Sequence, residues 1–326
     1  MHKHKGAAKA AHPKQGTNMK IAILDAQTFG DTDLSGSDQF GDVEIYQTTS
    51  QEQTKERITR ADVIVTNKVV ITDELMADAR ELKLICIAAT GMNNVDLEAA
   101  KKRGVEVKNV AGYSTDSVIQ HTFSMLFYLV GHSRYYDEFV KDESYANSEI
   151  FTNITKPFYE IKNKKWGIIG LGTIGSGVAN IANTFGADIC YYSTSGKNHS
   201  QPHKRVELDE LLCECDIISI HAPLNDKTNN LLDYEQLLMC KDGAVVLNLG
   251  RGGIINEDAI AKVIDEKNIS FGLDVFIKEP MVKNHPLLSV KNKQNLYMTP
   301  HIAWASAEAR DTLIASIIKN IINFLK

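Results

Sequence analysis

The sequence predicts an α/β protein with two doubly wound parallel sheets. Short apolar runs such as 20–25, 62–66 and 84–88 alternate with amphipathic stretches such as 72–79. Strands that alternate with helices pair in parallel and form layered α/β domains. A second series of the same kind begins at Lys165, and a chain of 326 residues is long enough for two such domains.

The first series ends in a long apolar helix. Before it we expect strands at 20–25, 62–66, 84–88 and 105–108, with helices at 72–79 and 95–103. The stretch 114–130 has no clear polar face and predicts a helix buried nearly all round, at a domain junction or a subunit interface. The segment 134–163 has weak periodicity, so we expect an irregular arm that is either mobile or packed on a second subunit.

The second series runs almost to the end of the chain. Its expected strands are 165–170, 188–193, 216–222, 244–249, 270–276 and 295–299. Its expected helices are 173–185, 208–213, 234–240 and 257–266, followed by a last helix at 307–324.

Composition narrows the class of protein. The net charge of −5 does not favour nucleic-acid binding, and no apolar run is long enough for a bilayer span. Residues 1–18 form a His-, Lys- and Ala-rich stretch without the apolar core of a signal peptide. They are typical of a flexible leader before a natural start at Met19, with a nucleic-acid-binding arm as the alternative.

The cysteines do not suggest a metal site. Five of them are spread along the chain without paired spacing, so we expect reduced thiols in a cytoplasmic protein and no bound metal.

A glycine-rich turn predicts a dinucleotide site. The run from Trp166 leads a strand into Gly170-Leu-Gly172-Thr173-Ile174-Gly175, which opens a helix. In this motif the first glycine permits a tight turn, the second lets a pyrophosphate approach, and the third lets helix and strand pack closely. The amides of the first helical turn then face the anion. This strand–turn–helix context predicts NAD or NADP as the cofactor.

The end of the next strand bears on the choice between these coenzymes. NAD sites usually place an acidic residue there to bind the ribose 2′-hydroxyl, whereas this chain has Ser193. Lys197 or Lys204 could attract a 2′-phosphate, so we expect relaxed coenzyme choice. The alternative is that the hydroxyl groups simply bind the ribose of NAD.

Three residues at predicted strand ends suit hydride transfer to a keto acid. They are Arg251, Glu279 and His301. A guanidinium binds a carboxylate through two parallel hydrogen bonds and can polarise a carbonyl. A histidine can supply the proton that the carbonyl oxygen takes up, and a neighbouring carboxylate stabilises its protonated form.

Taken together, these motifs resemble the D-isomer-specific 2-hydroxyacid dehydrogenase family over the whole chain from Met19. The motifs that carry the resemblance are 170–175, 221–223, 248–253, 274–280 and 299–306. The resemblance implies that Arg251 binds substrate, His301 is the acid/base and Glu279 is its partner. It also implies a coenzyme site with His221, Ala222, Pro223, Leu249 and Gly250, and with Asp274 near the nicotinamide.

The same resemblance implies substrate contacts and an architecture. The amides of Ala89, Thr90 and Gly91 would bind the substrate carboxylate, and Trp304 would wall a small pocket unless it is structural. A Rossmann dinucleotide-binding domain at 113–298 would be inserted into a flavodoxin-like substrate domain at 19–112 and 299–326. The helix 114–130 and the arm would form a homodimer.

Within the family, His301-Ile-Ala-Trp304 and Lys278-Glu279-Pro280 are most similar to the glycerate dehydrogenase, or hydroxypyruvate reductase, branch. A small 2-keto or 2-hydroxy acid is then the expected substrate. Two alternatives remain: a nucleotide-sensing corepressor similar to the C-terminal-binding proteins, and a formate dehydrogenase. The second is disfavoured by Glu279, because that relative pairs its histidine with glutamine.

Overall fold

The chain divides into two compact units. The computed structural model describes residues 18–197 and 202–326, so the predicted leader lies outside the described residues except for Asn18. The smaller unit ends at Tyr113 and resumes at Arg310, and the larger unit comprises Ser114–Ala309. Residues 299–309, which the sequence assigns to the substrate domain, have their contacts in the larger unit.

The smaller unit is a five-stranded parallel sheet. Its strands are β1 (Met19–Ile23), β2 (Gly41–Ile45), β3 (Val63–Thr66), β4 (Leu84–Ile87) and β5 (Glu106–Lys108). Their order is β2-β1-β3-β4-β5, which is the flavodoxin-like order that the sequence predicts. Strand β2 was not predicted, because it lies at the sheet edge and carries the exposed Asp42 and Glu44.

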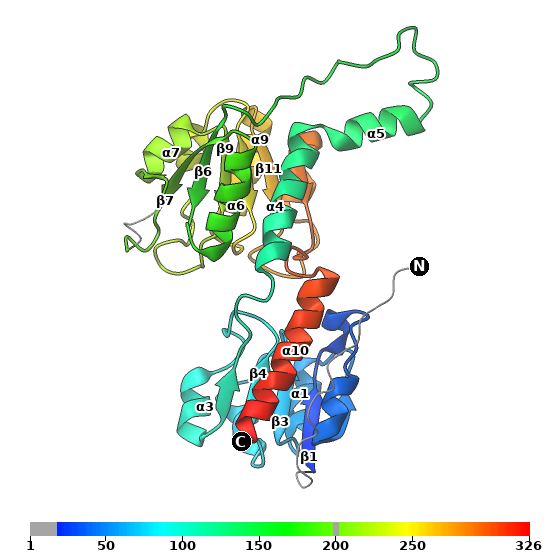
Figure 1. The fold of residues 1–326 in the computed structure, drawn as a ribbon, viewed down its shortest axis with the longest axis vertical. Helices are drawn as coiled ribbons and strands as arrows, with labels where there is room; N and C mark the ends of the chain where they lie inside the picture. Colours follow the sequence, from blue (N-terminus) through cyan, green and yellow to red (C-terminus); the bar gives the residue numbers. More distant parts are fainter. Residues whose placement is uncertain (1–17, 198–201) are drawn as a thin grey trace. The chain divides into compact units, whose positions relative to one another are not determined.

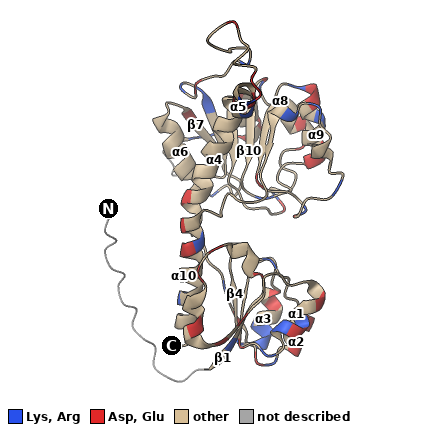
Figure 2. Ribbon diagram, turned by 90° about the vertical axis from the view of Figure 1, so that its right-hand side faces the viewer, with Lys and Arg blue, Asp and Glu red and all other residues tan. Residues whose placement is uncertain are grey.

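Helices cover both faces of this sheet. Helices α1 (Gln51–Ile58), α2 (Asp73–Asp78) and α3 (Leu97–Arg103) lie on one face, and α10 (Ala307–Phe324) lies on the other (Figure 2). Strands β3 and β4 are buried along their whole length, as expected for central strands of a parallel sheet.

The larger unit is a seven-stranded parallel sheet with the order β12-β11-β10-β9-β6-β7-β8 (Figure 1). Its strands are β6 (Lys165–Ile169), β7 (Asp188–Tyr192), β8 (Lys204–Arg205), β9 (Ile217–Ile220), β10 (Val245–Asn248), β11 (Ser270–Leu273) and β12 (Leu296–Met298). The order is that of a Rossmann fold with one extra strand, and the direction of winding reverses between β6 and β9.

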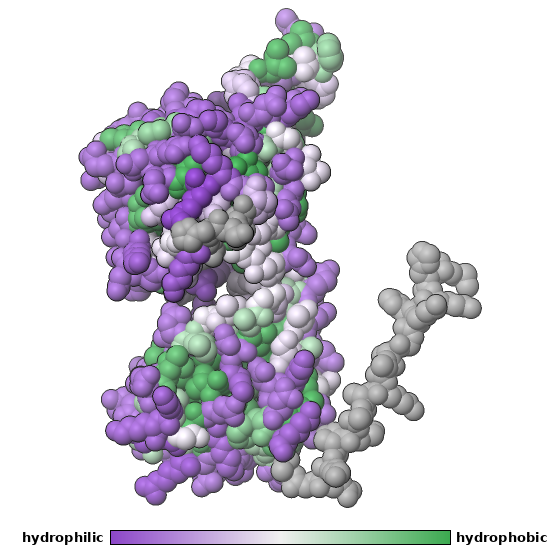
Figure 3. Space-filling model, turned by 60° about the vertical axis from the view of Figure 1, so that its left-hand side comes forward, coloured by the Kyte–Doolittle hydropathy of each residue, from purple (hydrophilic) through white to green (hydrophobic). Residues whose placement is uncertain are grey.

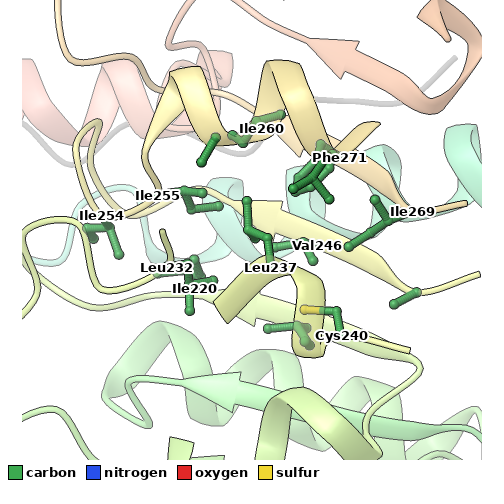
Figure 4. Close-up of a cluster of buried hydrophobic side chains, with 14 of the residues drawn as sticks. Ile220, Leu232, Leu237, Cys240, Val246, Ile254, Ile255, Ile260, Ile269 and Phe271 are labelled. Carbon is green, nitrogen blue, oxygen red and sulfur yellow. The ribbon is translucent and has the colours of Figure 1, made fainter. Parts of the chain in front are cut away.

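Two hydrophobic cores hold this sheet between helices. Helices α4 (Thr115–Val130) and α6 (Thr173–Thr184) pack on one face. Helices α7 (Leu208–Glu214), α8 (Tyr234–Met239) and α9 (Glu257–Glu266) pack on the other face, around buried side chains that include Val246, Ile260 and Phe271 (Figure 4). Both faces of the parallel sheet are therefore covered, as the sequence predicts.

Two expectations about helices need correction. Helix α4 is not buried nearly all round, because Asp116, Gln120, Ser124 and Phe127 are exposed on the side away from the sheet. The arm is also not wholly irregular: its first part forms α5 (Ser133–Lys141), stabilised by two i,i+4 ion pairs.

No helix within residues 18–197 and 202–326 combines the length and hydropathy that a bilayer span requires.

Candidate active site

The glycine-rich turn between β6 and α6 has the geometry that the sequence predicts. Gly170 has a φ of +93°, and a Cβ atom there would lie 2.9 Å from the Ala222 nitrogen. A Cβ atom on Gly175 would lie 2.4 Å from the Gly170 carbonyl oxygen, so only glycine lets helix and strand approach this closely. A Cβ atom on Gly172 would meet no described atom within 4 Å. Within the described part of the chain, no side chain caps the start of α6, so its first-turn amides remain suited to an anion.

A pocket of about 530 Å³ opens beside this turn, at the point where the winding of the sheet reverses. Open α/β sheets bind their ligands at such switch points. The predicted Gly170, Gly172, Ser193, His221, Ala222 and Pro223 all line this pocket. Thr173, Ile174 and Gly175 form the first turn of the adjoining helix.

His221 is a neutral group in this pocket. Burial lowers its pKa to about 3. Ser219 Oγ accepts a hydrogen bond from the Trp166 indole at 2.9 Å and lies 3.1 Å from His221 Nε2. The Ser219 hydroxyl can donate its own proton to Nε2, and in that arrangement the ring proton of His221 is on Nδ1.

Two buried polar atoms of the pocket lack hydrogen-bond partners among the described residues. They are His221 Nδ1 and Ser193 Oγ. Buried polar groups are nearly always paired in folded proteins, so each such group needs an explanation. A polar ligand bound beside the glycine turn would give both atoms a hydrogen-bond partner. The pocket therefore fits a dinucleotide.

Residues 193–197, which follow β7, contain no carboxylate. Ser193, Thr194, Ser195 and Lys197 line the pocket there. Lys204, the other lysine considered for a 2′-phosphate, forms an ion pair with Glu210 at 2.7 Å. Of the two lysines, Lys197 is therefore the better placed to attract a 2′-phosphate.

The predicted reacting residues follow three neighbouring parallel strands. Arg251 comes after β10, Glu279 after β11 and His301 after β12, so all three lie at the carboxyl edge of one sheet. His301 Nδ1 lies 2.7 Å from Glu279 Oε2, and both side chains are partly exposed. The second oxygen of Glu279, Oε1, accepts the Phe276 amide at 2.9 Å.

A buried aspartate holds the loop that carries His301. Asp274 Oδ1 accepts hydrogen bonds from the Thr299 hydroxyl at 2.6 Å and the Ile302 amide at 2.8 Å. Asp274 Oδ2 accepts the Ala303 amide at 3.0 Å. His301 itself has a φ of +54°, and its amide donates to the Asp274 carbonyl at 2.8 Å. A non-glycine residue in this region is uncommon and needs such support.

His121 on α4 extends this network. Its Nε2 lies 3.1 Å from Thr299 Oγ1, whose proton goes to Asp274. Burial lowers the pKa of His121, so its neutral ring can donate from Nε2 to Thr299.

A second buried carboxylate holds the loop that carries Glu279. Glu257 Oε1 accepts the Ile277 amide at 2.6 Å, and Oε2 lies 2.8 Å from His285 Nε2. His285 Nδ1 accepts the Leu287 amide at 3.3 Å, so its ring proton is on Nε2 and points to Glu257. Sequence reasoning missed this pair, because the two residues are 28 positions apart and no local pattern links them.

The turn that carries Arg251 is packed against the same loop. A Cβ atom on Gly252 would lie 2.0 Å from the Phe276 carbonyl, so only glycine fits. Asn248 holds the turn by donating to the Arg251 carbonyl at 2.9 Å and accepting the Gly250 amide at 3.1 Å. The Arg251 side chain is exposed, and its Nη1 donates to the Gly250 carbonyl at 2.8 Å.

The remaining predicted residues are placed as follows. Leu249 is buried at the end of β10, and Trp304 is half-buried three residues after His301. Ala89, Thr90 and Gly91 follow β4 in the smaller unit, where the Thr90 carbonyl accepts Asn109 Nδ2 at 2.7 Å. Within the described ranges, no group of three or more His, Cys, Asp or Glu residues is arranged to hold a metal ion.

Comparison with known proteins points to one family. Residues 123–303 match the model of the NAD-binding domain of D-isomer-specific 2-hydroxyacid dehydrogenases. The chain is 33% identical to a hydroxypyruvate reductase of Blautia hydrogenotrophica, with 94% of this chain and 97% of the relative covered. It is 30% identical to a glycerate dehydrogenase of Methylorubrum extorquens, with 94% and 96% covered.

A solved structure agrees with these relatives. An acyclic imino acid reductase in complex with NADPH and D-Arg matches with a TM-score of 0.82 and 30% identity, over 94% of this chain and 97% of that one. The resemblance inferred from the motifs is thus confirmed. The chain belongs to the D-isomer-specific 2-hydroxyacid dehydrogenase family and is an NAD(P)-dependent oxidoreductase.

Proposed function

We propose that this protein reduces a small 2-keto acid to the D-2-hydroxy acid, with His301 as the acid and Arg251 as the group that binds the substrate carboxylate. The observation that carries the proposal is the 2.7 Å approach of His301 Nδ1 to Glu279 Oε2 at the sheet edge that also carries Arg251. Hydroxypyruvate and glyoxylate are the keto acids we favour, because relatives are named hydroxypyruvate reductase and glyoxylate reductase.

The chemistry assigns one task to each residue. A bound reduced nicotinamide supplies the hydride. The Arg251 guanidinium pairs with the carboxylate of the keto acid in a planar, bidentate arrangement. The carbonyl oxygen gains negative charge as its carbon is reduced, and the proton on His301 Nε2 neutralises it. Glu279 stabilises the protonated ring and keeps a proton on Nδ1, so that Nε2 faces the reaction.

Asp274 and Glu257 act as positioning residues in this proposal. Asp274 uses both carboxylate oxygens on the loop of His301, and Glu257 uses both on the segment before Glu279 and on His285. Both side chains are less than one-tenth exposed and their oxygens are occupied by these hydrogen bonds, so in this proposal they hold the loops and do not contact the substrate.

We also propose that two copies associate through the arm. Exposed apolar side chains gather there (Figure 3), and the most exposed are Phe151 at 88%, Ile154 at 78% and Tyr159 at 67%. A second exposed apolar patch lies on α4 and α6, where Phe127 and Phe185 are in edge-to-face contact at 5.6 Å. Exposed apolar patches of this kind are typical of protein–protein interfaces. Five free cysteines favour a cytoplasmic location, where thiols stay reduced.

Replacing His301 by alanine should lower kcat for keto-acid reduction by about 10²- to 10⁴-fold, because the general acid is lost. Binding of NADPH, measured by quenching of protein fluorescence, should stay nearly unchanged. Arg251→Lys should instead mainly raise KM, because a point charge cannot reproduce the planar guanidinium. A His301→Ala enzyme that retains most of its kcat would exclude the proposed acid.

Coenzyme choice should be relaxed, with NADPH used at least as well as NADH. Ser193→Asp should lower kcat/KM with NADPH by about tenfold or more, because a carboxylate repels the 2′-phosphate and favours the ribose 2′-hydroxyl. The measurement is kcat/KM and Kd with both coenzymes for the two proteins. Strong NADH selectivity of the unmodified chain would contradict the interpretation of Ser193 and Lys197.

The arm can be tested by sedimentation velocity. We expect the unmodified chain to sediment as a dimer, and Phe151→Asp to shift it toward the monomer, because a buried charge without a partner is costly at an apolar interface. Val70→Asp is the matched control, since Val70 is an exposed apolar residue of the smaller unit. A monomer at all concentrations of the unmodified chain would exclude the proposed assembly.

A further inference from the structure

Two cysteines that are far apart in sequence lie together in the larger unit. The Sγ atoms of Cys190 and Cys215 are 3.4 Å apart, although the two residues are 25 positions apart in the sequence. Cys190 is half-buried on β7, and Cys215 is buried at the end of α7. The sequence predicted five unpaired thiols, because the spacing of Cys190 and Cys215 in the chain gives no indication that they are in contact.

A missing side chain on the intervening strand creates the contact. Strand β6 lies between β7 and β9, and its Gly167 is in register with Cys190. A Cβ atom on Gly167 would lie 2.8 Å from Cys215 Sγ and 2.5 Å from a carbon of Leu211. The two thiols therefore meet in the space above Gly167, under α7.

The two thiols are chemically unequal. The hydrogen bond between the two thiols lowers the pKa of Cys190, and the same hydrogen bond together with burial raises the pKa of Cys215. Cys190 is also the less buried of the two, so a peroxide reaches its sulfur first, and the thiolate is the reactive form of cysteine. Cys215 stays protonated and lies within reach of the product.

We propose that Cys190 and Cys215 form an oxidative modification site that hydroperoxides convert into a disulfide. The Cys190 thiolate attacks a peroxide oxygen, the O–O bond breaks, and the alcohol or water leaves with a proton while Cys190 becomes a sulfenic acid. The Cys215 sulfur then attacks Cys190, the S–O bond breaks and water leaves with the thiol proton. Overall, the dithiol loses two electrons and two protons, and the peroxide is reduced to an alcohol, or to water, and a further water molecule.

Formation of the disulfide requires only a small movement of the two sulfur atoms. The sulfur atoms must approach from 3.4 Å to the S–S bond length of about 2.05 Å. The bond would join the end of α7 to β7, whose next residues line the coenzyme pocket. Disulfides of cytoplasmic proteins are usually transient and redox-sensing, and this pair fits that class. The site does not depend on the reaction proposed above.

Peptide mapping can detect the bond directly. In the Cys213→Ser variant, tryptic peptides 166–197 and 206–227 contain one cysteine each, Cys190 and Cys215. After treatment of the full chain with hydrogen peroxide, non-reducing mass spectrometry should find these two peptides joined, with the mass of two hydrogens lost. Dithiothreitol should separate them.

Two matched variants identify the order of events. Cys215→Ser should block the cross-link and leave Cys190 as a sulfenic acid that dimedone traps, whereas Cys190→Ser should yield neither product. Unmodified protein and Cys213→Ser should form the cross-link to the same extent. Peroxide treatment that oxidises the exposed Cys213 of the unmodified chain without joining Cys190 to Cys215 would overturn the proposal, as would a cross-link from Cys190 to Cys213.

Discussion

The hydrogen bond between His301 and Glu279 is the interaction on which the proposed chemistry depends. The two residues are 22 positions apart and follow adjacent strands, so their 2.7 Å approach requires that both loops have defined shapes. A surface ion pair of this kind contributes little to stability, because solvent screens it. Its value lies in fixing the imidazole: Nδ1 is engaged by the carboxylate, and Nε2 remains for the substrate.

Two buried carboxylates hold these loops in their conformations. Asp274 binds the backbone of the His301 loop, which allows His301 to adopt a positive φ, and Glu257 binds the backbone at Ile277. The close approach of Gly252 to Phe276 then ties the Arg251 turn to the loop of Glu279. The acids that touch no substrate in our proposal thus determine where the reacting groups lie.

Much of this could be predicted from sequence, and the limits have physical causes. The glycine turn and the strand-end residues were predictable because each depends on local order: a strand, a turn and a helix in succession. Strand β2 was not, because an edge strand buries little and carries no long apolar run. The apolar composition of α4 led to the prediction of a helix buried nearly all round, but Phe127 is exposed.

Long-range partners were the least predictable part. The pairing of Glu257 with His285, of His121 with Thr299 and of Cys190 with Cys215 depends on strand register and loop packing. Single sequences carry no signal for such contacts. The choice between the two lysines near the 2′-position likewise required the ion pair of Lys204 with Glu210.

The most direct test of the central claim is kcat for keto-acid reduction by Glu279→Gln beside that of the unmodified enzyme and of His301→Ala. The carboxylate oxygen at 2.7 Å fixes the His301 ring through Nδ1 and compensates the charge of an imidazolium, whereas an amide oxygen carries no charge. We therefore predict that kcat of Glu279→Gln falls toward that of His301→Ala while the Kd of NADPH stays nearly unchanged. A variant that keeps the kcat of the unmodified enzyme would contradict the claim that Glu279 holds His301 in its working state.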